Sequence, residues 1–235
     1  MRPIEKGESP YKEIARYQDA EPYLEKRLGP YCSFCEMRVN NALAVEHEES
    51  KNSGGALTDW NNLLLACTYC NSRKSEKVKK GELNKWIWPD MHNTFLAFSY
   101  EEGIPKVNEQ YLMSISNEVL QRARQTFEDL ALDYRPQVDQ TPQYRDKRWS
   151  KRFEAVNVAG EARENWLKCK NSEFRNMQIS TIVSLAKGYG FFSVWMKMFE
   201  DEPEIKTALI AAFPGTDESS FDDKGNPKKR KESEL

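Results

Sequence analysis

The sequence lacks long hydrophobic runs and a large excess of charge of either sign. No apolar stretch approaches the roughly 20 residues that a membrane-spanning helix needs. The first residues are charged from Arg2 onward and lack the apolar core of a secretory signal. The formal net charge of −2 argues against a wholly basic nucleic-acid coat protein, although it is compatible with a local basic face. We therefore expect a cytoplasmic protein that does not cross a membrane.

Histidine and cysteine are also scarce, with two and five residues among 235. Four of the cysteines form two Cys-x-x-Cys pairs, Cys32 with Cys35 and Cys67 with Cys70. In the cytosol such pairs are more often metal ligands than disulfides, and two of them commonly form the tetrahedral site of a structural zinc ion. Because four cysteines leave no open coordination position, we expect Zn²⁺ to stabilise the fold and not to react.

The segment between the cysteine pairs predicts a β-hairpin with a long loop, followed by a helix. Residues 43–47 (LAVEH) and 62–66 (NLLLA) are short, mostly apolar runs that are typical of strands. Residues 48–61 between them are polar and contain two adjacent glycines, which indicates a loop. The charged stretch that begins at Asn71 predicts a helix, which Gly81 interrupts or ends.

This hairpin would bring different polar groups to one pocket. Glu46 and His47 end the first strand, Asn62 begins the second, and Asn71 begins the helix. Carboxylate and amide oxygens suit a hard cation such as Mg²⁺, which binds few protein ligands and keeps several waters. An imidazole with a pKa of about 6.5 can take a proton from water. These groups suffice for one-metal hydrolysis of a phosphodiester. The second histidine, His92, is expected to be a surface or loop residue without a catalytic role.

The remainder of the chain is predicted to be mainly helical. In residues 117–134 the apolar positions recur at spacings close to one helical turn, and Ser116 is placed to cap the start. Residues 144–170 form a charged amphipathic pattern, and Gly160 is predicted to break the helix. Residues 175–199 are far more apolar and predict a buried core helix, broken close to its Gly-Tyr-Gly sequence.

The stretch from Glu46 to Lys74 resembles the HNH, or ββα-metal, nuclease motif. In that family an acidic residue and a histidine precede a loop, which is followed by Asn-Leu, Cys-x-x-Cys-Asn and a downstream lysine. The corresponding residues here are Glu46-His47, Asn62-Leu63, Cys67-Thr68-Tyr69-Cys70-Asn71 and Lys74. Two positions depart from the most common form, because Glu46 replaces the usual aspartate and Asn71 replaces the final histidine.

The resemblance implies a role for each matching residue. His47 would be the general base that activates water, with Asn62 orienting its ring and Lys74 as a further catalytic residue. Glu46 and Asn71 would bind the catalytic divalent cation, Mg²⁺ or Mn²⁺, which stabilises the leaving 3′-oxygen and the charge of the transition state. A glutamate in place of aspartate adds a methylene group, which can alter the metal preference or the geometry.

A narrower resemblance covers residues 1 to about 85, which are similar to the PtuB-type HNH proteins of bacterial anti-phage Septu and retron systems. It rests on the opening MRPIEKGESP and on the segments YCSFCE, VEH and DWNNLLLAC. In that group glutamate before the histidine is usual. The resemblance implies a bacterial cytoplasmic protein of phage defence that acts with PtuA, an ABC-type ATPase that restrains or delivers the nuclease. In a retron system, a reverse transcriptase with its RNA–DNA hybrid would be a further partner.

Basic side chains cluster on the stretch that follows the second cysteine pair. Arg73, Lys77, Lys79 and Lys80 would contact backbone phosphates without reading the base sequence. The alternative is an ordinary solvated helix face. The substrate would be DNA or a structured RNA such as tRNA, and the sequence does not distinguish between them.

Three functions fit the zinc-binding frame. The first is a metal-dependent endonuclease. The second is a non-catalytic zinc-ribbon module that binds nucleic acid, in which Glu46, His47 and Asn71 are incidental. The third is an assembly subunit whose helical C-terminal half matters most. The presence of all the polar residues of the motif at their expected places favours the first.

We therefore predict an α+β fold in which a zinc-stapled ββα-metal (HNH) nuclease core precedes a mainly α-helical C-terminal region. The chain divides into an N-terminal helical segment packed on the core (1–30), a zinc-knuckle HNH nuclease domain (31–113), a helical partner-binding region (114–215) and a disordered tail (216–235). The tail is predicted to be disordered because it is polar and its charges occur in blocks.

Overall fold

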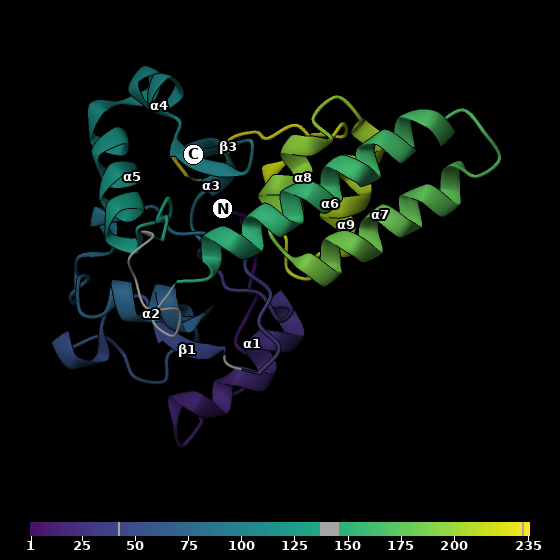
Figure 1. The fold of residues 1–235 in the computed structure, drawn as a ribbon. Helices are drawn as coiled ribbons and strands as arrows, with labels where there is room; N and C mark the ends of the chain where they lie inside the picture. Colours follow the sequence, from purple (N-terminus) through teal and green to yellow (C-terminus); the bar gives the residue numbers. More distant parts are fainter. Residues whose placement is uncertain (42, 137–145, 232) are drawn as a thin grey trace.

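The chain forms a mixed α+β structure with two small antiparallel hairpins and a mainly helical C-terminal region (Figure 1), which confirms the predicted fold class. The computed structural model describes residues 1–41, 43–136, 146–231 and 233–235. Its α-helices are α1 (Glu21–Leu28), α2 (Thr68–Lys74), α3 (Thr94–Ala97), α4 (Glu109–Ile115), α5 (Asn117–Leu130), α6 (Arg148–Cys169), α7 (Arg175–Tyr189), α8 (Phe192–Met198) and α9 (Pro203–Ala212). Its strands are β1 (Ala44–His47), β2 (Leu63–Ala66), β3 (Phe98–Glu101) and β4 (Ile104–Val107). No helix within the described ranges has the length and apolarity that crossing a membrane requires.

The first hairpin positions the predicted site residues. β1 and β2 pair antiparallel, with Ala44 opposite Ala66 and His47 opposite Leu63. All four residues of β2 are apolar and buried, which explains why so short a run forms a strand. α2 begins directly after Cys67 and packs against both strands. The predicted order of strand, loop, strand and helix is therefore confirmed.

The helix after the second cysteine pair is shorter than predicted. α2 ends at Lys74, and Ser75, with a φ of 45°, turns the chain away from the helix axis. The following residues return to the loop between the strands, where the Ser50 amide donates to the Val78 carbonyl oxygen and the Val78 side chain is fully buried. Burial of this valine outweighs the helical tendency of the charged residues around it.

Helices α5 and α6 differ in how they follow the sequence. Ser116 caps α5 as predicted, because its hydroxyl accepts a hydrogen bond from the Val119 amide at 3.1 Å. α6 continues through Gly160 without the predicted break. A glycine costs a helix interior only about 1 kcal/mol relative to alanine. Burial of Ala159 and Ala162 in an apolar cluster shared with α7 and α8 offsets this cost.

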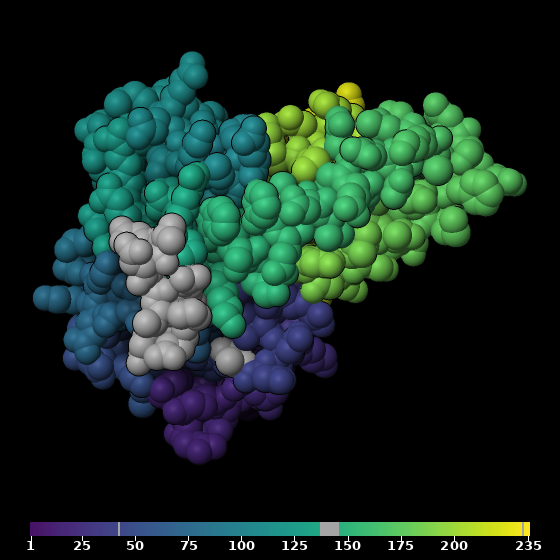
Figure 2. All heavy atoms as spheres, in the orientation of Figure 1, coloured from purple at the N-terminus to yellow at the C-terminus, as the bar shows by residue number. Residues whose placement is uncertain are grey.

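The apolar segment from residue 175 to residue 199 forms two helices of different character. They are separated at Gly190, whose φ of 75° breaks the helix at the predicted place. The first five residues of α8 are all buried. α7 instead buries only Ile182 and Ala186, so the expected buried core helix is wrong for this half. α6 and α7 lie side by side and project from the body, and we call them the helical arm (Figures 1 and 2).

The C-terminal tail is folded against the protein and is not the predicted disordered segment. The Asn93 side-chain amide donates to the carbonyl oxygens of Ser220 and Lys228, both at 2.8 Å. Phe221 is buried and its ring lies against that of Phe192. Composition averaged over the tail is polar, but one buried aromatic side chain and one asparagine with matched carbonyl groups are enough to fix it.

The two ends of the chain lie close together in the middle of the molecule (Figure 1). The Thr94 hydroxyl donates to the carbonyl oxygen of Met1 at 2.8 Å. The neighbouring Asn93 amide donates to the carbonyl oxygen of Leu235 at 3.3 Å. Both Met1 and Leu235 are fully buried, so residues from the two ends share one core with the short helix α3.

His92 lies in the loop before α3, as predicted, but its side chain is buried and not at the surface. Its Nε2 accepts a hydrogen bond from the Arg122 guanidinium at 2.9 Å, because a guanidinium can only donate. Its Nδ1 lies 3.2 Å from the carbonyl oxygen of Trp88. Burial and the charge of Arg122 lower the pKa of His92 to about 4, so the ring is neutral at pH 7.

We predict that His92 makes the protein less stable in acid. The unfolded chain binds a proton at a pKa of about 6.5, whereas the folded chain binds it at about 4, so stability falls as the pH is lowered through this window. Linkage gives a loss of about 2 kcal/mol between pH 7.5 and pH 5. Denaturant unfolding of the wild type and of His92→Gln at both pH values measures the difference. Equal losses in the two proteins would contradict the assignment.

Candidate functional site

The four cysteines of the two pairs form one buried cluster. Their sulfur atoms all lie within 4.8 Å of one another, and the Sγ atoms of Cys35 and Cys67 are 3.7 Å apart. A disulfide would require about 2.05 Å. Tetrahedral zinc with Zn–S bonds of about 2.3 Å places two sulfurs about 3.8 Å apart. The donor set and its spacing therefore fit a closed structural zinc site.

A buried arginine connects this cluster to the helical region. The Arg148 guanidinium lies 3.4 Å from the Cys70 sulfur and pairs with the Asp146 carboxylate at 2.7 Å. It also donates to the carbonyl oxygens of Leu130 and Ala131 at the end of α5, both at 2.9 Å. Such partners around a metal site orient its ligands and stabilise the thiolate charge. Sequence spacing gives no signal for Arg148, because it lies far along the chain from the cysteines.

A polar cavity of about 210 Å³ lies beside the zinc cluster, between β1, the loop that follows it, α2 and the N-terminal segment. It brings together Glu46, His47 and Asn71, as the sequence predicts. The cavity is also lined by Tyr17 and Lys51, which the sequence does not predict as site residues. The remaining lining residues are Val45, Ser50, Asn52, Ser75 and Glu76. Tyr17 belongs to a segment that was expected only to pack on the core.

The His47 ring is held in one orientation and one tautomer. Its Nε2 lies 2.9 Å from the carbonyl oxygen of Leu57, which can only accept, so Nε2 carries the hydrogen in the neutral ring. Nδ1 is then the nitrogen that can accept a proton. The Tyr17 ring meets the imidazole edge-on, with 4.7 Å between centroids. Burial lowers the pKa of His47, and the charges of Lys51 and Lys74 add to the decrease, which favours the neutral base.

Asn62 has different partners from those expected. Its side-chain oxygen accepts from the Glu49 amide at 2.7 Å, and its amide group donates to the carbonyl oxygens of Glu49 and Ala56. These bonds close the base of the loop that carries Leu57. Asn62 therefore contacts the loop backbone, and none of these bonds is to the His47 ring.

Glu46 and Lys74 form a buried ion pair on one side of the cavity. The Lys74 ammonium lies 3.1 Å from Oε1 of Glu46 and is fully buried. Burial raises the pKa of Glu46 and lowers that of Lys74, so the attraction between them only partly offsets the loss of solvation. The second carboxylate oxygen of Glu46 accepts no hydrogen bond from the residues that the structure describes. With the Asn71 amide, it offers the oxygen ligands that a hard divalent cation prefers.

A second buried charged group supports the end of β1. The Lys6 ammonium lies 3.0 Å from the Glu48 carboxylate and 2.7 Å from that of Asp90. It also donates to the carbonyl oxygens of Trp60 and Leu63. Burial raises the pKa of Glu48 well above its usual range, and the neighbouring Asp90 adds to this increase. Glu48 directly follows His47, so this group fixes the strand end that carries the imidazole.

The predicted nucleic-acid contacts divide into paired and unpaired cations. Arg73 lies 3.5 Å from the Asp146 carboxylate, and Lys77 lies 2.8 Å from that of Asp129. Lys79 and Lys80 are exposed and form no ion pair within the described part of the chain. All of these side chains lie outside the cavity that contains His47.

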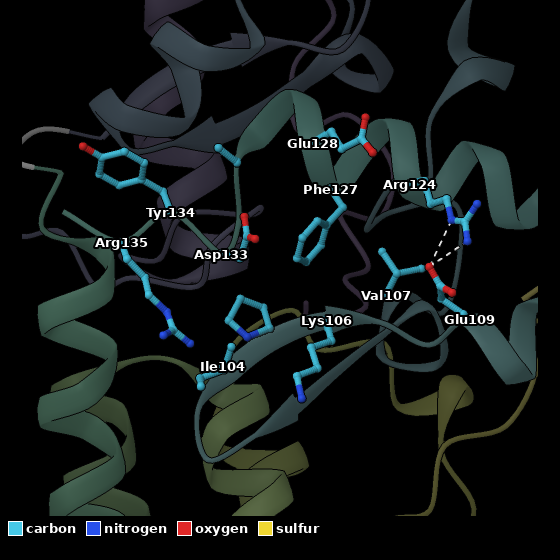
Figure 3. Close-up of a pocket in the computed structure, with 12 residues that line it drawn as sticks. Ile104, Lys106, Val107, Glu109, Arg124, Phe127, Glu128, Asp133, Tyr134 and Arg135 are labelled. Atoms are coloured by element: carbon cyan, nitrogen blue, oxygen red, sulfur yellow. Dashed lines mark hydrogen bonds and ion pairs between the residues drawn. The ribbon is translucent and has the colours of Figure 1, made fainter. Parts of the chain in front are cut away.

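A larger hollow of about 1000 Å³ lies elsewhere, between β4 and the end of α5 (Figure 3). Its rim carries both signs of charge, including an ion pair at 2.8 Å between Arg124 and Glu109. The apolar side chains of Phe127 and Val107 form part of its wall. None of the predicted site residues lines it, so size alone does not identify the candidate site.

We predict that Cys67→Ser loses zinc and with it the folded state. Structural zinc supplies about 10–16 kcal/mol in small zinc-binding peptides, which exceeds the stability of most domains. Zinc analysis of the purified protein and its cooperative thermal unfolding measure the effect. Cys169 lies outside the cluster, so Cys169→Ser is the matched control. This variant should keep its zinc content and its cooperative unfolding. A Cys67→Ser protein that stays folded with a full zinc content would refute the structural role.

Comparison with known proteins finds a family match over the segment that contains the cysteine pairs and the cavity residues. Residues 30–77 match the family model described as HNH endonuclease. Searches of curated proteins and of solved structures found no match. The matched residues include both cysteine pairs, β1, β2 and α2, together with the cavity residues Glu46, His47 and Asn71. The chain therefore contains an HNH endonuclease domain at residues 30–77.

Proposed function

We propose that the protein is a metal-dependent endonuclease that hydrolyses phosphodiester bonds in nucleic acid. The observation that carries this proposal is the convergence of Glu46, His47 and Asn71 on one cavity within the HNH domain. The sequence places these residues on a strand and a helix, and the packing of α2 against the hairpin makes them neighbours. A zinc module without catalytic activity would have no need for an oriented neutral imidazole at this place.

His47 acts as the general base in this proposal. Its Nδ1 takes a proton from a water molecule, whose oxygen attacks the phosphorus while the bond to the 3′-oxygen breaks. The positive charge that develops on the ring is stabilised by the hydrogen bond from Nε2 to the Leu57 carbonyl oxygen. Burial keeps the ring neutral before the reaction and therefore able to accept the proton.

Glu46 and Asn71 would hold the divalent cation, Mg²⁺ or Mn²⁺. When bound, such a cation neutralises charge on the phosphate and stabilises the leaving oxygen. Lys74 restrains the Glu46 side chain through their buried ion pair and has no access to solvent. We therefore propose that Lys74 positions the ligand and does not contact the substrate.

We predict that His47→Gln and His47→Ala lose at least ~100-fold in cleavage rate, because general-base catalysis is typically worth that much or more. Glutamine retains an amide that can donate to the Leu57 carbonyl oxygen but offers no base, so it tests chemistry with the loop contact kept. Both variants should retain zinc and their melting temperature. The assay measures Mg²⁺-dependent cleavage of double-stranded DNA, single-stranded DNA and structured RNA, with and without EDTA. Wild-type rates in both variants would refute the nuclease assignment and leave a zinc-ribbon binding module.

We also propose that the protein belongs to a bacterial anti-phage complex with a PtuA-like ABC-type ATPase, with a retron reverse transcriptase as a further partner. The similarity of residues 1 to about 85 to PtuB-type proteins supports this proposal. The helical arm supports it as well, because Leu167, Phe174 and Met177 are 45%, 50% and 58% exposed near its tip. Exposed apolar side chains that cluster in this way are typical of protein contacts.

We predict that the double variant Phe174→Ser, Met177→Ser weakens the complex with the ATPase at least tenfold while the free energy of unfolding changes little, because both side chains are already largely exposed. Co-purification and titration of the two proteins measure the effect. Met113→Ser is the matched control, since Met113 is 55% exposed on α4, away from the arm. Unchanged affinity in the double variant would place the contact elsewhere.

A further inference from the structure

One wall of the cavity carries a lysine, Lys51. The Lys51 ammonium donates a hydrogen bond to the Tyr17 hydroxyl at 2.7 Å and lies 4.3 Å from the centre of its ring. The same Tyr17 ring lies edge-on against His47. The three side chains therefore form a continuous row along the cavity, with the cation at one end and the imidazole at the other.

Two lysines of α2 and the segment after it pair with carboxylates, whereas Lys51 has no such partner within the described residues. Lys74 pairs with Glu46, and Lys77 pairs with Asp129. Lys51 forms no ion pair among the residues that the structure describes, and its hydrogen-bond partner is a neutral phenol. An exposed ammonium with this partner has no carboxylate partner in the described part of the chain that competes with a ligand.

The acidic side chains of the cavity are both engaged. The Glu46 carboxylate faces Lys74 on the buried side. The Glu76 carboxylate accepts a hydrogen bond from the Asn52 side-chain amide at 2.7 Å, which joins the loop to the end of α2. Neither carboxylate pairs with Lys51 within the described residues, so neither competes directly with a ligand for its ammonium.

We propose that Lys51 and Tyr17 form a phosphate-binding subsite, in which the Lys51 ammonium binds a non-bridging oxygen of the nucleic-acid backbone next to the bond that is cleaved. This inference rests on the proposed nuclease function and names two further residues of the same site. Tyr17 positions the ammonium through its hydroxyl and holds it beside the imidazole. The N-terminal segment thereby becomes part of the substrate site.

This chemistry predicts a contact that depends on salt and not on base sequence. An ammonium is a point charge that recognises phosphate oxygens, and each phosphate contact releases condensed counterions when it forms. A plot of log affinity against log salt concentration has a negative slope. Loss of one such contact reduces the magnitude of this slope by about 0.7 for single strands and 0.9 for duplex DNA. A lysine with only a structural role would leave this slope unchanged.

The test measures binding and cleavage separately. Binding of labelled single-stranded DNA, duplex DNA and an RNA hairpin is titrated over a range of salt concentrations in a His47→Ala background, which prevents turnover. The variants are Lys51→Met, Lys51→Arg and Tyr17→Phe. Lys26→Met, an exposed lysine on α1 outside the cavity, removes the same charge and is the control. Cleavage by the same variants is measured with His47 intact, and zinc content and melting temperature report folding.

The proposal requires that Lys51→Met weaken binding roughly tenfold, since a hydrogen bond to a charged group is typically worth this much, and reduce the salt slope by the amount of one contact. Lys51→Arg should restore most of the affinity, Tyr17→Phe should lie between, and Lys26→Met should match the parent. Cleavage by Lys51→Met should show a raised KM. A protein with His47 intact that binds but does not cleave, with the Lys51 effect on binding intact, would refute the nuclease function and support the subsite. Equal slopes for Lys51→Met and Lys26→Met, or a parent that binds none of the three nucleic acids, would overturn the subsite.

Discussion

The four-cysteine cluster is the constraint on which the rest of the structure depends. It joins a turn before β1 to the start of α2, so the two strands and the helix between which the cavity lies are fixed at their ends. Through the Arg148 guanidinium, the cluster also reaches α5 and α6. A zinc ion held by these sulfurs therefore connects the HNH domain to the helical region as well as closing the hairpin.

Around this frame, the cavity combines buried and accessible charges with distinct tasks. The pair of Glu46 with Lys74 and the group of Lys6 with Glu48 and Asp90 lie below the surface and restrain the strand. Buried charged pairs contribute little net stability because desolvation opposes their attraction. Their value here is orientation of the residues that face the cavity. The accessible charge of Lys51 is free for a substrate in the proposed mechanism.

The N-terminal segment and the C-terminal tail lie outside the HNH motif, yet both contribute specific contacts to the structure. The N-terminal segment supplies Tyr17 to the cavity and Lys6 to the buried charged group. The tail folds onto Asn93, although its composition predicts disorder. In both cases a few specific contacts determine how the segment folds. The average composition of the segment does not reveal these contacts.

By itself the sequence determined the four cysteine ligands, the hairpin and helix of the HNH motif, and the convergence of Glu46, His47 and Asn71, because local spacing and periodicity encode these features. Only the tertiary structure decided that Asn62 bonds to the backbone of the loop and that α6 passes through Gly160. It also decided that Arg148 lies at the cysteine cluster and that Tyr17 and Lys51 line the cavity. These features depend on contacts between residues far apart in the chain. Such contacts depend on packing and desolvation over the whole core. Local patterns in the sequence therefore do not predict them.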